Sequence, residues 1–324
     1  MRISLLIVVL GWCLEVWLCS GLKLRRFFAT TISGFEEVLR SEIAVLPEVS
    51  SVRAQKLGVY FEGPTSVGFH AVLRLRVALR IYEELAHMER GLESVDDLYY
   101  FVKQGACWDD LISSESTLKS DCVLSSSVHP SLCHSHFSAL TIKNAICDFL
   151  VEKHGARPNI DKEDPDCVIT GYFSHTKSTL YRVWSGPSSL HKRGYRANAV
   201  QHKAALRETT AAGLCYIAGW DSLKHELIDP MCGSGSIVIE AALIAAGTAP
   251  GLVHPEVNGP GPKFLFKDVD LRLWTQAKEE AIRLDQRKKL SGVLIHANDV
   301  SESAISLAKM GARKAVSITL STLA

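Results

Sequence analysis

A glycine-rich turn between two apolar stretches constrains this chain more than any other feature. It reads Asp-Pro-Met-Cys-Gly-Ser-Gly-Ser over residues 229–236. Gly233 and Gly235 permit the backbone angles of a tight turn, and Ser236 is suited to cap a helix that Gly247 ends. The pattern predicts a strand, a turn and a helix, which is the unit of an open α/β sheet.

The turn also limits the class of ligand that this site can bind. Asp229 follows the predicted strand, at the edge where open α/β sheets bind their ligands. A P-loop would need Lys after Gly235, and a dinucleotide fingerprint would need a third Gly where Val238 stands. The remaining interpretation is a cofactor without phosphates, held by the backbone and a carboxylate, and S-adenosylmethionine fits that description. The alternative is a turn with no ligand.

Other segments stand at consistent distances from this turn. Ile-Val-Ile-Glu-Ala-Ala follows it directly, Ser-Leu-His-Lys-Arg-Gly-Tyr-Arg occupies residues 189–196, Leu-Arg-Glu-Thr residues 206–209 and Ala-Pro-Gly-Leu residues 249–252. Together these segments resemble the THUMP-domain RNA guanine-N2 methyltransferases, especially those that act on large-subunit ribosomal RNA. The resemblance extends from about Phe27 to about Ala312.

This resemblance implies an α/β fold class. We expect a ferredoxin-like and THUMP α+β region that binds RNA over residues 27–185, followed by a Rossmann-like methyltransferase domain over residues 188–324. In the family, an Asn-Pro-Pro-Tyr or Asp-Pro-Pro-Tyr acceptor motif follows the fourth strand, and this chain contains no Pro-Pro pair. The Rossmann-like domain is therefore expected to be incomplete, and the chain to be truncated.

The missing motif leaves two functions open. Guanine N2 is a poor nucleophile, so the oxygens of the acceptor motif are needed to orient it and to stabilise the charge that develops. No catalytic residue is therefore assigned. The first expectation is an S-adenosylmethionine-dependent methyltransferase acting on guanine N2 of ribosomal RNA. The alternative is a catalytically silent RNA-binding fragment.

The expected cofactor site combines the turn with a second acidic residue. Asp299 follows the predicted strand 293–297, and an acid at that position of a Rossmann-like sheet binds ribose hydroxyls. The resemblance also implies that residues 207–209 line the site. The predicted cofactor-binding residues are Asp229, Pro230, Cys232, Gly233, Gly235 and Asp299.

Any RNA-binding surface must come from local patches, because the net charge is only +1. Residues 191–196 combine cations with an aromatic ring, which suits phosphate contact or base stacking. The resemblance implies that the THUMP region recognises RNA by shape and phosphates. The candidates are Lys153, Arg157, Lys177, Arg182, Lys192, Arg193, Tyr195 and Arg196, and for each the alternative is an ordinary surface side chain.

No metal site is expected. His129, Cys133, His134 and His136 lie in one serine-rich loop, without the well-spaced second pair of ligands that a zinc site needs. The nine cysteines are an odd number and form no Cys-x-x-Cys pair, which favours reduced thiols in an intracellular protein.

The N-terminus points to a different compartment. Residues 1–22 form a hydrophobic extension in which Arg2 precedes an apolar run, as in a secretory signal. A membrane span is less favoured, since residues 3–18 are shorter than about 20 residues and include Glu15. An RNA substrate instead implies the cytoplasm, a plastid or a mitochondrion. Secretion or anchoring through residues 3–18 stays open.

Hydrophobic periodicity predicts the remaining elements. Within the predicted helix 67–85, Arg74, Arg76 and Arg80 are interpreted as a solvated face, with RNA contact as the alternative. Helices are expected over residues 33–46, 67–85, 137–153, 204–217, 271–289 and 301–309, and strands over residues 52–62, 122–128, 168–173, 179–184 and 293–297.

Overall fold

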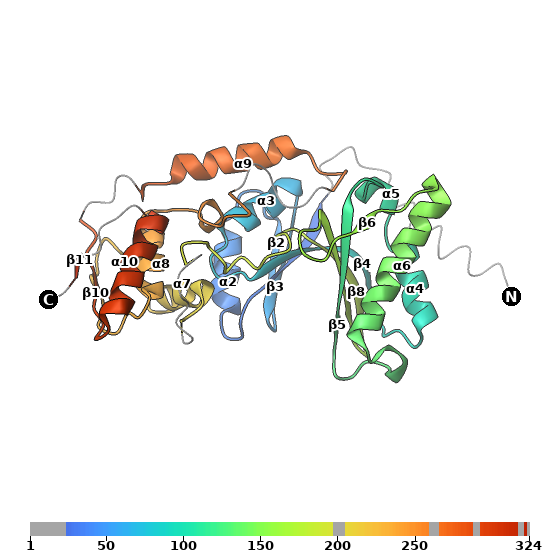
Figure 1. Ribbon diagram of the computed structural model, residues 1–324, viewed down its shortest axis with the longest axis horizontal. Coiled ribbons are helices and arrows are strands. Elements are labelled where there is room, and N and C mark those ends of the chain that lie inside the picture. The colour runs from blue at the N-terminus through green and yellow to red at the C-terminus, as the bar shows by residue number, and fades with distance from the viewer. Residues whose placement is uncertain (1–23, 197–204, 259–265, 288–291, 317–320, 323–324) are drawn as a thin grey trace.

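The computed structural model describes residues 24–196, 205–258, 266–287, 292–316 and 321–322. The hydrophobic extension at residues 1–22 lies outside them, so the expectations for it stay untested. Among the described residues, no helix is both long and apolar enough to cross a membrane. The molecule is elongated and contains two sheets, one in each half of the chain (Figure 1).

The N-terminal half is built on one continuous sheet. Its elements are β1 (Arg25–Thr30), α2 (Glu36–Ala44), β2 (Ser51–Gln55), β3 (Gly58–Gly63), α3 (Thr65–Arg74), β4 (Arg80–Met88), α4 (Val95–Gln104), α5 (Trp108–Leu111), β5 (Thr117–Leu124), η1 (Pro130–Leu132), α6 (Ser135–His154), β6 (Asn159–Ile160), β7 (Cys167–Phe173) and β8 (Ser178–Val183). The eight strands are ordered β2-β3-β1-β4-β8-β7-β5-β6. Helices α2 and α3 pack on one end of the sheet, and α4 and α6 on the other (Figure 1). The antiparallel pairing of β4 with β8 joins these two α+β parts.

The C-terminal half contains a short parallel sheet. Its elements are α7 (Glu208–Ile217), β9 (Leu227–Asp229), α8 (Ser236–Ala245), η2 (Pro250–Leu252), α9 (Leu271–Leu284), β10 (Ile295–Ala297), α10 (Glu302–Val316) and β11 (Ser321–Thr322). The described strands are ordered β11-β10-β9, and Ala297 of β10 lies opposite Asp229 of β9. Helix α8 packs against α7 and α10. The strand–turn–helix predicted around residues 229–236 is therefore present.

Aromatic side chains form the centre of the larger core. Phe27 of β1 stacks on Phe61 of β3, with ring centroids 5.2 Å apart. Trp184 meets Phe27 edge-on at 5.5 Å and Phe69 of α3 at 5.0 Å. All four rings are fully buried, and each such burial stabilises the fold by about 2–3 kcal/mol. This core fixes α3 on the sheet.

A strap from the C-terminal half crosses to the N-terminal half. We use this name for residues 266–284, which comprise a short extended segment and α9. Helix α9 lies along α3, where Trp274 contacts Phe69 edge-on at 5.5 Å (Figure 1). Before the helix, the backbone N–H of Lys267 donates to the carbonyl of Leu111 at 3.0 Å. The strap therefore joins the two halves at two points along its length.

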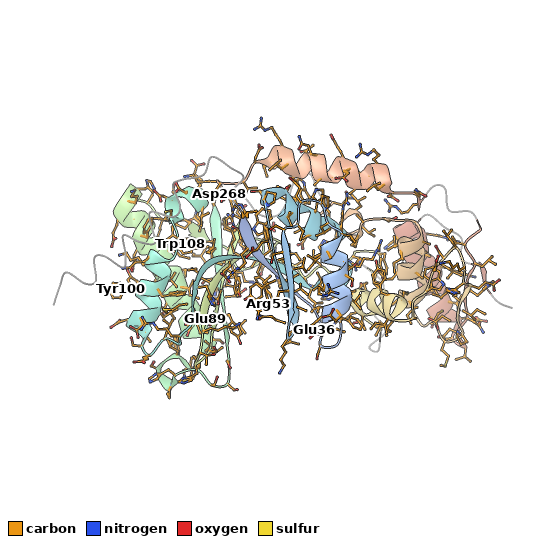
Figure 2. The ribbon with its side chains drawn as sticks, turned by 180° about the vertical axis from the view of Figure 1, so that it is seen from behind. Glu36, Arg53, Glu89, Tyr100, Trp108 and Asp268 are labelled. Atoms are coloured by element: carbon orange, nitrogen blue, oxygen red, sulfur yellow. The ribbon has the colours of Figure 1, made fainter. Side chains whose placement is uncertain are left out.

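Asp268 of the strap, labelled in Figure 2, completes a buried ion cluster. Arg182 of β8 donates to both carboxylate oxygens of Asp268, at 2.6 and 3.0 Å. Arg25 of β1 reaches Asp268 at 3.0 Å and Glu83 of β4 at 2.9 Å. Arg182 is 0% exposed, so its charge is compensated inside the protein. The expectation that Arg182 contacts RNA at the surface is therefore wrong.

Two secondary-structure expectations are also wrong. Residues 67–85 form helix α3, which ends at Arg74, and then strand β4 from Arg80. The Glu42 carboxylate accepts the backbone N–H groups of Arg76 and Val77 directly after the helix. Arg76 is buried rather than solvated, and its guanidinium donates to the carbonyls of Leu243 and Thr248.

Residues 52–62 form a hairpin of β2 and β3, turning through Leu57 at φ 66°.

Most other elements agree with expectation within a few residues. The helices at 135–154 and 271–284 and the hairpin of β7 and β8 are where the sequence placed them. Strand β5 begins at Thr117, before the predicted start, and α10 continues to Val316. Gly235 is the N-cap of α8, while the hydroxyl of Ser236 donates to the carbonyl of Leu206. Ser236 therefore joins the helix to a preceding segment rather than capping it.

Candidate cofactor site

The candidate site lies at the carboxyl ends of β9 and β10. The two strands run parallel and adjacent, so Asp229 and Asp299 come to the same edge of the sheet. Gly233 has φ 54° and Gly235 has φ 82°, in the left-handed region that favours glycine. A Cβ at Gly235 would lie 2.9 Å from Cβ of Ala308, whereas a Cβ at Gly233 would meet no atom within 4 Å. Gly235 therefore serves close packing, and Gly233 faces open space.

Asp299 ties the glycine turn to the end of β10. Its Oδ2 accepts the backbone N–H of Gly233 at 2.9 Å, and its Oδ1 accepts that of Ser301 at 2.9 Å. The backbones are also joined, since Cys232 N–H donates to the Asn298 carbonyl at 2.8 Å. The carboxylate thus fixes the shape of the turn.

The environment of Asp229 favours a positively charged partner. Burial raises the pKa of this carboxyl above its ordinary value of 3.8, the N–H of Met231 lowers it and the charge of Asp299 raises it. Met231 N–H donates to Oδ1 at 3.2 Å, and Oδ2 has no hydrogen-bond partner among the described residues. A cation or hydroxyl placed at Oδ2 would relieve the repulsion between the two carboxylates.

Cys232 is a buried thiol in the same turn. Burial raises its pKa to about 11, and the neighbouring charges of Asp229 and Asp299 act in the same direction. The thiol is therefore protonated at neutral pH, which argues against a nucleophilic role. Its small, 8% exposed side chain agrees with the interpretation as a space-filling residue in the turn.

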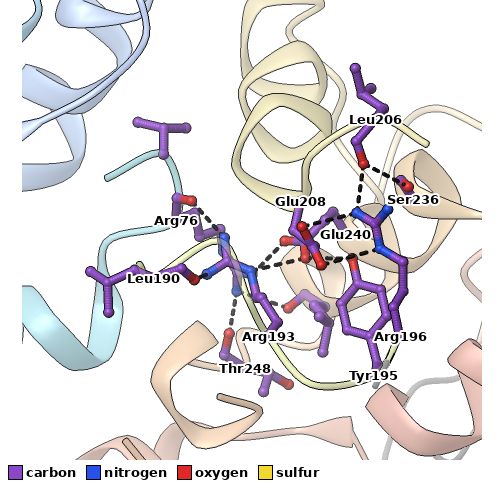
Figure 3. Close-up of polar contacts among 12 residues, drawn as sticks. Arg76, Leu190, Arg193, Tyr195, Arg196, Leu206, Glu208, Ser236, Glu240 and Thr248 are labelled. Carbon is purple, nitrogen blue, oxygen red and sulfur yellow. Dashed lines mark hydrogen bonds and ion pairs between the residues drawn. The ribbon is translucent and has the colours of Figure 1, made fainter. Parts of the chain in front are cut away.

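The segment before α7 is fixed by a second buried ion cluster (Figure 3). The guanidinium of Arg193 donates to Glu240 of α8 at 3.0 Å and to the carbonyl of Arg76 at 2.5 Å. The hydroxyl of Tyr195 also donates to Glu240 at 3.0 Å. Arg193 is 1% exposed and Tyr195 2%. The expectation that these two residues bind RNA is wrong, because their polar groups are already paired inside the protein.

Arg196 belongs to the same cluster. It forms a 2.9 Å ion pair with Glu208, and its Nη2 donates to the carbonyl of Leu206 at 2.6 Å. Glu208, within the segment that the resemblance assigned to the cofactor site, is 6% exposed and turned toward Arg196. Arg196 keeps only a small exposed part, with 16% of its side chain accessible. Its main role in this structure is to hold the segment at residues 189–196 against α7.

The remaining RNA candidates are at the surface and stay predictions. Lys153 and Arg157 are exposed at the carboxyl end of α6, where the Lys153 ammonium lies 4.0 Å from Asp109. Lys192 is exposed in the segment at residues 189–196. Lys177 lies over the ring of Tyr172, 5.2 Å from its centroid.

The histidines of the serine-rich loop have other contacts. His129 Nδ1 lies 2.8 Å from the hydroxyl of Ser131, and the rings of His134 and His136 flank Phe137. Within the described part of the chain, no group of three or more His, Cys, Asp or Glu is placed to hold a metal ion.

Both buried clusters escaped sequence reasoning. Within each cluster the partners come from segments far apart along the chain: Glu83 and Asp268 in one cluster, and Arg76 and Glu240 in the other. Each of these residues resembles an ordinary surface charge when seen alone. The one local signal is the position of Glu240, which stands within the apolar run that follows the turn. A charge at that position indicates a buried partner, since unpaired buried carboxylates are rare.

Three family models match consecutive parts of the chain. The RlmL ferredoxin-like domain matches residues 26–82, the THUMP domain residues 93–183, and the RMKL-like methyltransferase domain residues 193–321. These matches confirm the fold class expected for both halves of the chain.

Curated relatives are similar over most of this chain. The ribosomal RNA large subunit methyltransferase K/L of Hydrogenovibrio crunogenus is 34% identical over 287 residues, which is 88% of this chain and 38% of that protein. The protein of the same name from Syntrophotalea carbinolica is 40% identical over 236 residues, 71% of this chain and 31% of that protein. The chain thus spans less than two fifths of the length of these relatives.

Solved structures share the fold. A predicted N6-adenine-specific DNA methylase from Listeria monocytogenes is 26% identical with a TM-score of 0.76, covering 93% of this chain and 75% of that one. A possible methylase from Clostridium difficile is 25% identical with a TM-score of 0.77, at the same coverage. A third structure, assigned as a methyltransferase and complexed with SAH, is 23% identical with a TM-score of 0.76 and covers 93% of this chain and 76% of that one. The arrangement of both halves therefore recurs in other proteins.

Proposed function

We propose that this chain belongs to the family that joins an RlmL ferredoxin-like domain, a THUMP domain and an RMKL-like methyltransferase domain. In this proposal the chain binds S-adenosylmethionine and acts in methyl transfer to large-subunit ribosomal RNA. One observation carries the proposal. Asp229 and Asp299 stand at the ends of adjacent parallel strands, beside a turn whose Gly233 faces open space. The names of the relatives and the SAH complex of one structural neighbour support it.

The residues present fit this cofactor. S-adenosylmethionine carries positive charge and ribose hydroxyls but no phosphate, so carboxylates rather than cations should surround it. Asp229 would hold a positively charged group, because its carboxylate is half-buried and its Oδ2 lacks a partner among the described residues. Asp299 would share its carboxylate with ribose hydroxyls, and Gly233 lets the backbone come close. Pro230, Cys232 and Gly235 would shape the turn.

The chain's own residues supply binding and orientation. When bound, S-adenosylmethionine supplies an electrophilic methyl group on a positively charged sulfur. Asp299 keeps the turn in one shape before binding, since it holds the Gly233 and Ser301 N–H groups. Such preorganisation lowers the entropic cost of placing a donor near an acceptor. Guanine N2 as the acceptor rests on the family resemblance, and the 324-residue sequence contains no Asn-Pro-Pro-Tyr or Asp-Pro-Pro-Tyr motif to orient it.

The N-terminal half would bind the RNA. Lys153, Arg157 and Lys192 remain candidate contacts, since their side chains are exposed. Ribosomal RNA as substrate implies an intracellular location, in the cytoplasm or in an organelle.

The alternative proposal is an RNA-binding chain that is silent in catalysis. The test is incubation of the purified chain with ribosomal RNA and methyl-labelled S-adenosylmethionine, followed by nucleoside analysis. Label on N2-methylguanosine would support the enzyme and exclude the silent alternative. Label on N6-methyladenosine would support a methyltransferase with a different acceptor. RNA binding without label would favour the silent chain.

A further inference from the structure

The glycine turn at residues 229–236 has two anchors on neighbouring segments. In the turn, the N–H of Gly233 donates to Asp299, and at its end Ser236 begins α8. The hydroxyl of Ser236, a residue that is 4% exposed, donates to the carbonyl of Leu206 at 3.0 Å. Asp299 belongs to the candidate cofactor site, whereas Leu206 stands just before α7. The second anchor therefore lets residues outside the site act on the shape of the turn.

The carbonyl of Leu206 depends on side chains for its donors. Leu206 precedes the first turn of α7, and among the described residues no backbone N–H donates to this carbonyl. Its donors are the hydroxyl of Ser236 and Nη2 of Arg196, the latter at 2.6 Å (Figure 3). A hydrogen bond from a charged guanidinium is stronger than one from a neutral group. Arg196 therefore fixes the position of the carbonyl to which Ser236 is bonded.

Glu208 of α7 holds the Arg196 guanidinium in the orientation that this contact needs. Nε of Arg196 donates to Oε1 of Glu208 at 3.1 Å, and Nη2 lies 2.9 Å from Oε2. Such a two-point contact fixes the plane of the guanidinium. The two side chains are 16% and 7% exposed, so solvent screens the pair only weakly. A continuous chain of contacts thus leads from Glu208 through Arg196 and Leu206 to the first residue of α8.

The residues just before Arg196 contact α8 one turn further on. Arg193 and Tyr195 both donate to Oε1 of Glu240 at 3.0 Å. Glu240 and Ser236 are four positions apart and therefore share one face of the helix. The contacts with Glu240 hold the body of α8, whereas the contact through Ser236 holds only its first residue, next to the glycine turn. Loss of the Arg196 contact should therefore release the turn while the helix stays in place.

We infer that Arg196 is a positioning residue for cofactor binding, which acts through the Leu206 carbonyl and Ser236 to hold the glycine turn in its binding shape. The inference rests on the proposed function and adds a residue that acts on the turn from outside it. A turn that is anchored before the ligand arrives loses less conformational entropy on binding. Arg196 therefore raises the affinity for S-adenosylmethionine and S-adenosylhomocysteine without a contact to either.

The experiment is calorimetric titration of the purified full chain with S-adenosylhomocysteine, for the wild type, Arg196→Lys, Ser236→Ala and the double variant. Lysine keeps a positive charge beside Glu208 but lacks the second nitrogen that reaches Leu206. Each single substitution should weaken binding about fivefold. The double variant should also stay near fivefold, because both changes break the same chain of contacts, whereas independent effects would multiply to about 25-fold.

Arg287→Lys is the matched control. Arg287 donates to the carbonyl of Ala315 at 2.9 Å and pairs with Asp285 at 2.7 Å, so it makes the same kinds of contact at the carboxyl ends of α9 and α10. The substitution should lower the midpoint of thermal unfolding, as Arg196→Lys does, but leave the affinity for S-adenosylhomocysteine unchanged. A shared loss of stability with a loss of affinity only in Arg196→Lys would separate positioning of the turn from support of the fold.

Two results would overturn the inference while leaving the proposed function standing. One is a double variant whose loss equals the product of the single losses, which would show that Arg196 does not act through Ser236. The other is an Arg196→Lys variant with wild-type affinity and a lowered unfolding midpoint. If Arg196→Lys does not fold, Ser236→Ala decides, since wild-type affinity in that variant also overturns the inference. A folded wild-type chain that binds no S-adenosylhomocysteine would instead contradict the proposed function itself.

Discussion

Arg193 shows how strongly the role of a residue depends on its neighbours in space. In the sequence it belongs to a basic and aromatic segment that suits RNA, whereas in the structure its guanidinium is buried against Glu240. Arg76 lies near the same carboxylate, and Tyr195 donates to it. Glu240 is 0% exposed, so it compensates charges that would otherwise be buried alone.

This arrangement predicts a large cost for neutralising Glu240. Glu240→Gln should lower the free energy of unfolding by about 3–5 kcal/mol, because it leaves the buried Arg193 without its countercharge. Urea denaturation gives this difference directly. Glu226→Gln, at a carboxylate with 57% of its side chain exposed, is the control and should cost at most about 0.5 kcal/mol. Equal effects of the two substitutions would contradict the importance of the cluster.

At the scale of elements, the turn between β9 and α8 depends on two glycines for different reasons. Both have positive φ, but a Cβ at Gly235 would strike Ala308 of α10, and a Cβ at Gly233 would enter open space. The sequence predicted the turn, but it could not show that one glycine serves packing and the other leaves a surface open.

The two glycines therefore predict different outcomes for the same substitution. Gly235→Ala should destabilise the chain by about 2 kcal/mol or more, since backbone strain adds to displacement of α10. Gly233→Ala should cost only about 1 kcal/mol, through backbone strain alone, while impairing cofactor binding if the ligand approaches this backbone. Thermal unfolding measures the first effect and calorimetry the second. Equal destabilisation by both substitutions would contradict the assignment.

Sequence patterns predicted elements where one periodicity persists, as in α6 and in the β7–β8 hairpin. They failed at residues 67–85, because the end of α3 is stabilised by Glu42, a residue from a different helix. They failed again at Leu57, where a hairpin turns without glycine or asparagine. Of the candidate site, Asp229 and the turn were predictable from local sequence. The buried roles of Arg182, Arg193 and Tyr195 depend on tertiary partners.

At the scale of the whole molecule, the strap couples the two halves. It leaves the C-terminal half, reaches the eight-stranded sheet through Asp268 and returns along α3 (Figure 1). Burial by itself raises the pKa of Asp268, but its hydrogen bonds and proximity to Arg182 and Arg25 outweigh burial and lower the pKa below 3.8. The ionised carboxylate therefore stabilises the joined state of the two halves.

Asp268→Asn should accordingly weaken the whole fold. We expect the free energy of unfolding at pH 7 to fall by about 3 kcal/mol, because Arg25 and Arg182 then have Glu83 as their shared carboxylate partner. A carboxyl whose pKa is depressed in the folded state stabilises at pH values above its unfolded pKa, and this stabilisation is lost as pH falls through the folded pKa. The difference in the free energy of unfolding between Asp268→Asn and the wild type should therefore be full above about pH 5 and shrink below about pH 3.8. Denaturation at several pH values measures it.

Asp270→Asn is the control for this substitution. Asp270 caps α9 and pairs with Arg272 at the surface, and asparagine caps helices about equally well. Its cost should be much smaller than that of Asp268→Asn, because its ion pair with Arg272 is exposed to solvent. A pH-independent loss in Asp268→Asn would contradict the assigned ionic role.

The most direct test of the central claim is calorimetric titration of the purified chain with S-adenosylhomocysteine. The proposed function predicts binding at one site. It further predicts that Asp229→Asn weakens binding at least tenfold, because a hydrogen bond to a charged group is worth about 1.5–3 kcal/mol. Lys224→Ala, at an exposed ion pair away from the turn, should leave the affinity unchanged. A folded chain that binds no S-adenosylhomocysteine, or an Asp229→Asn variant that binds it as tightly as the wild type, would contradict the claim.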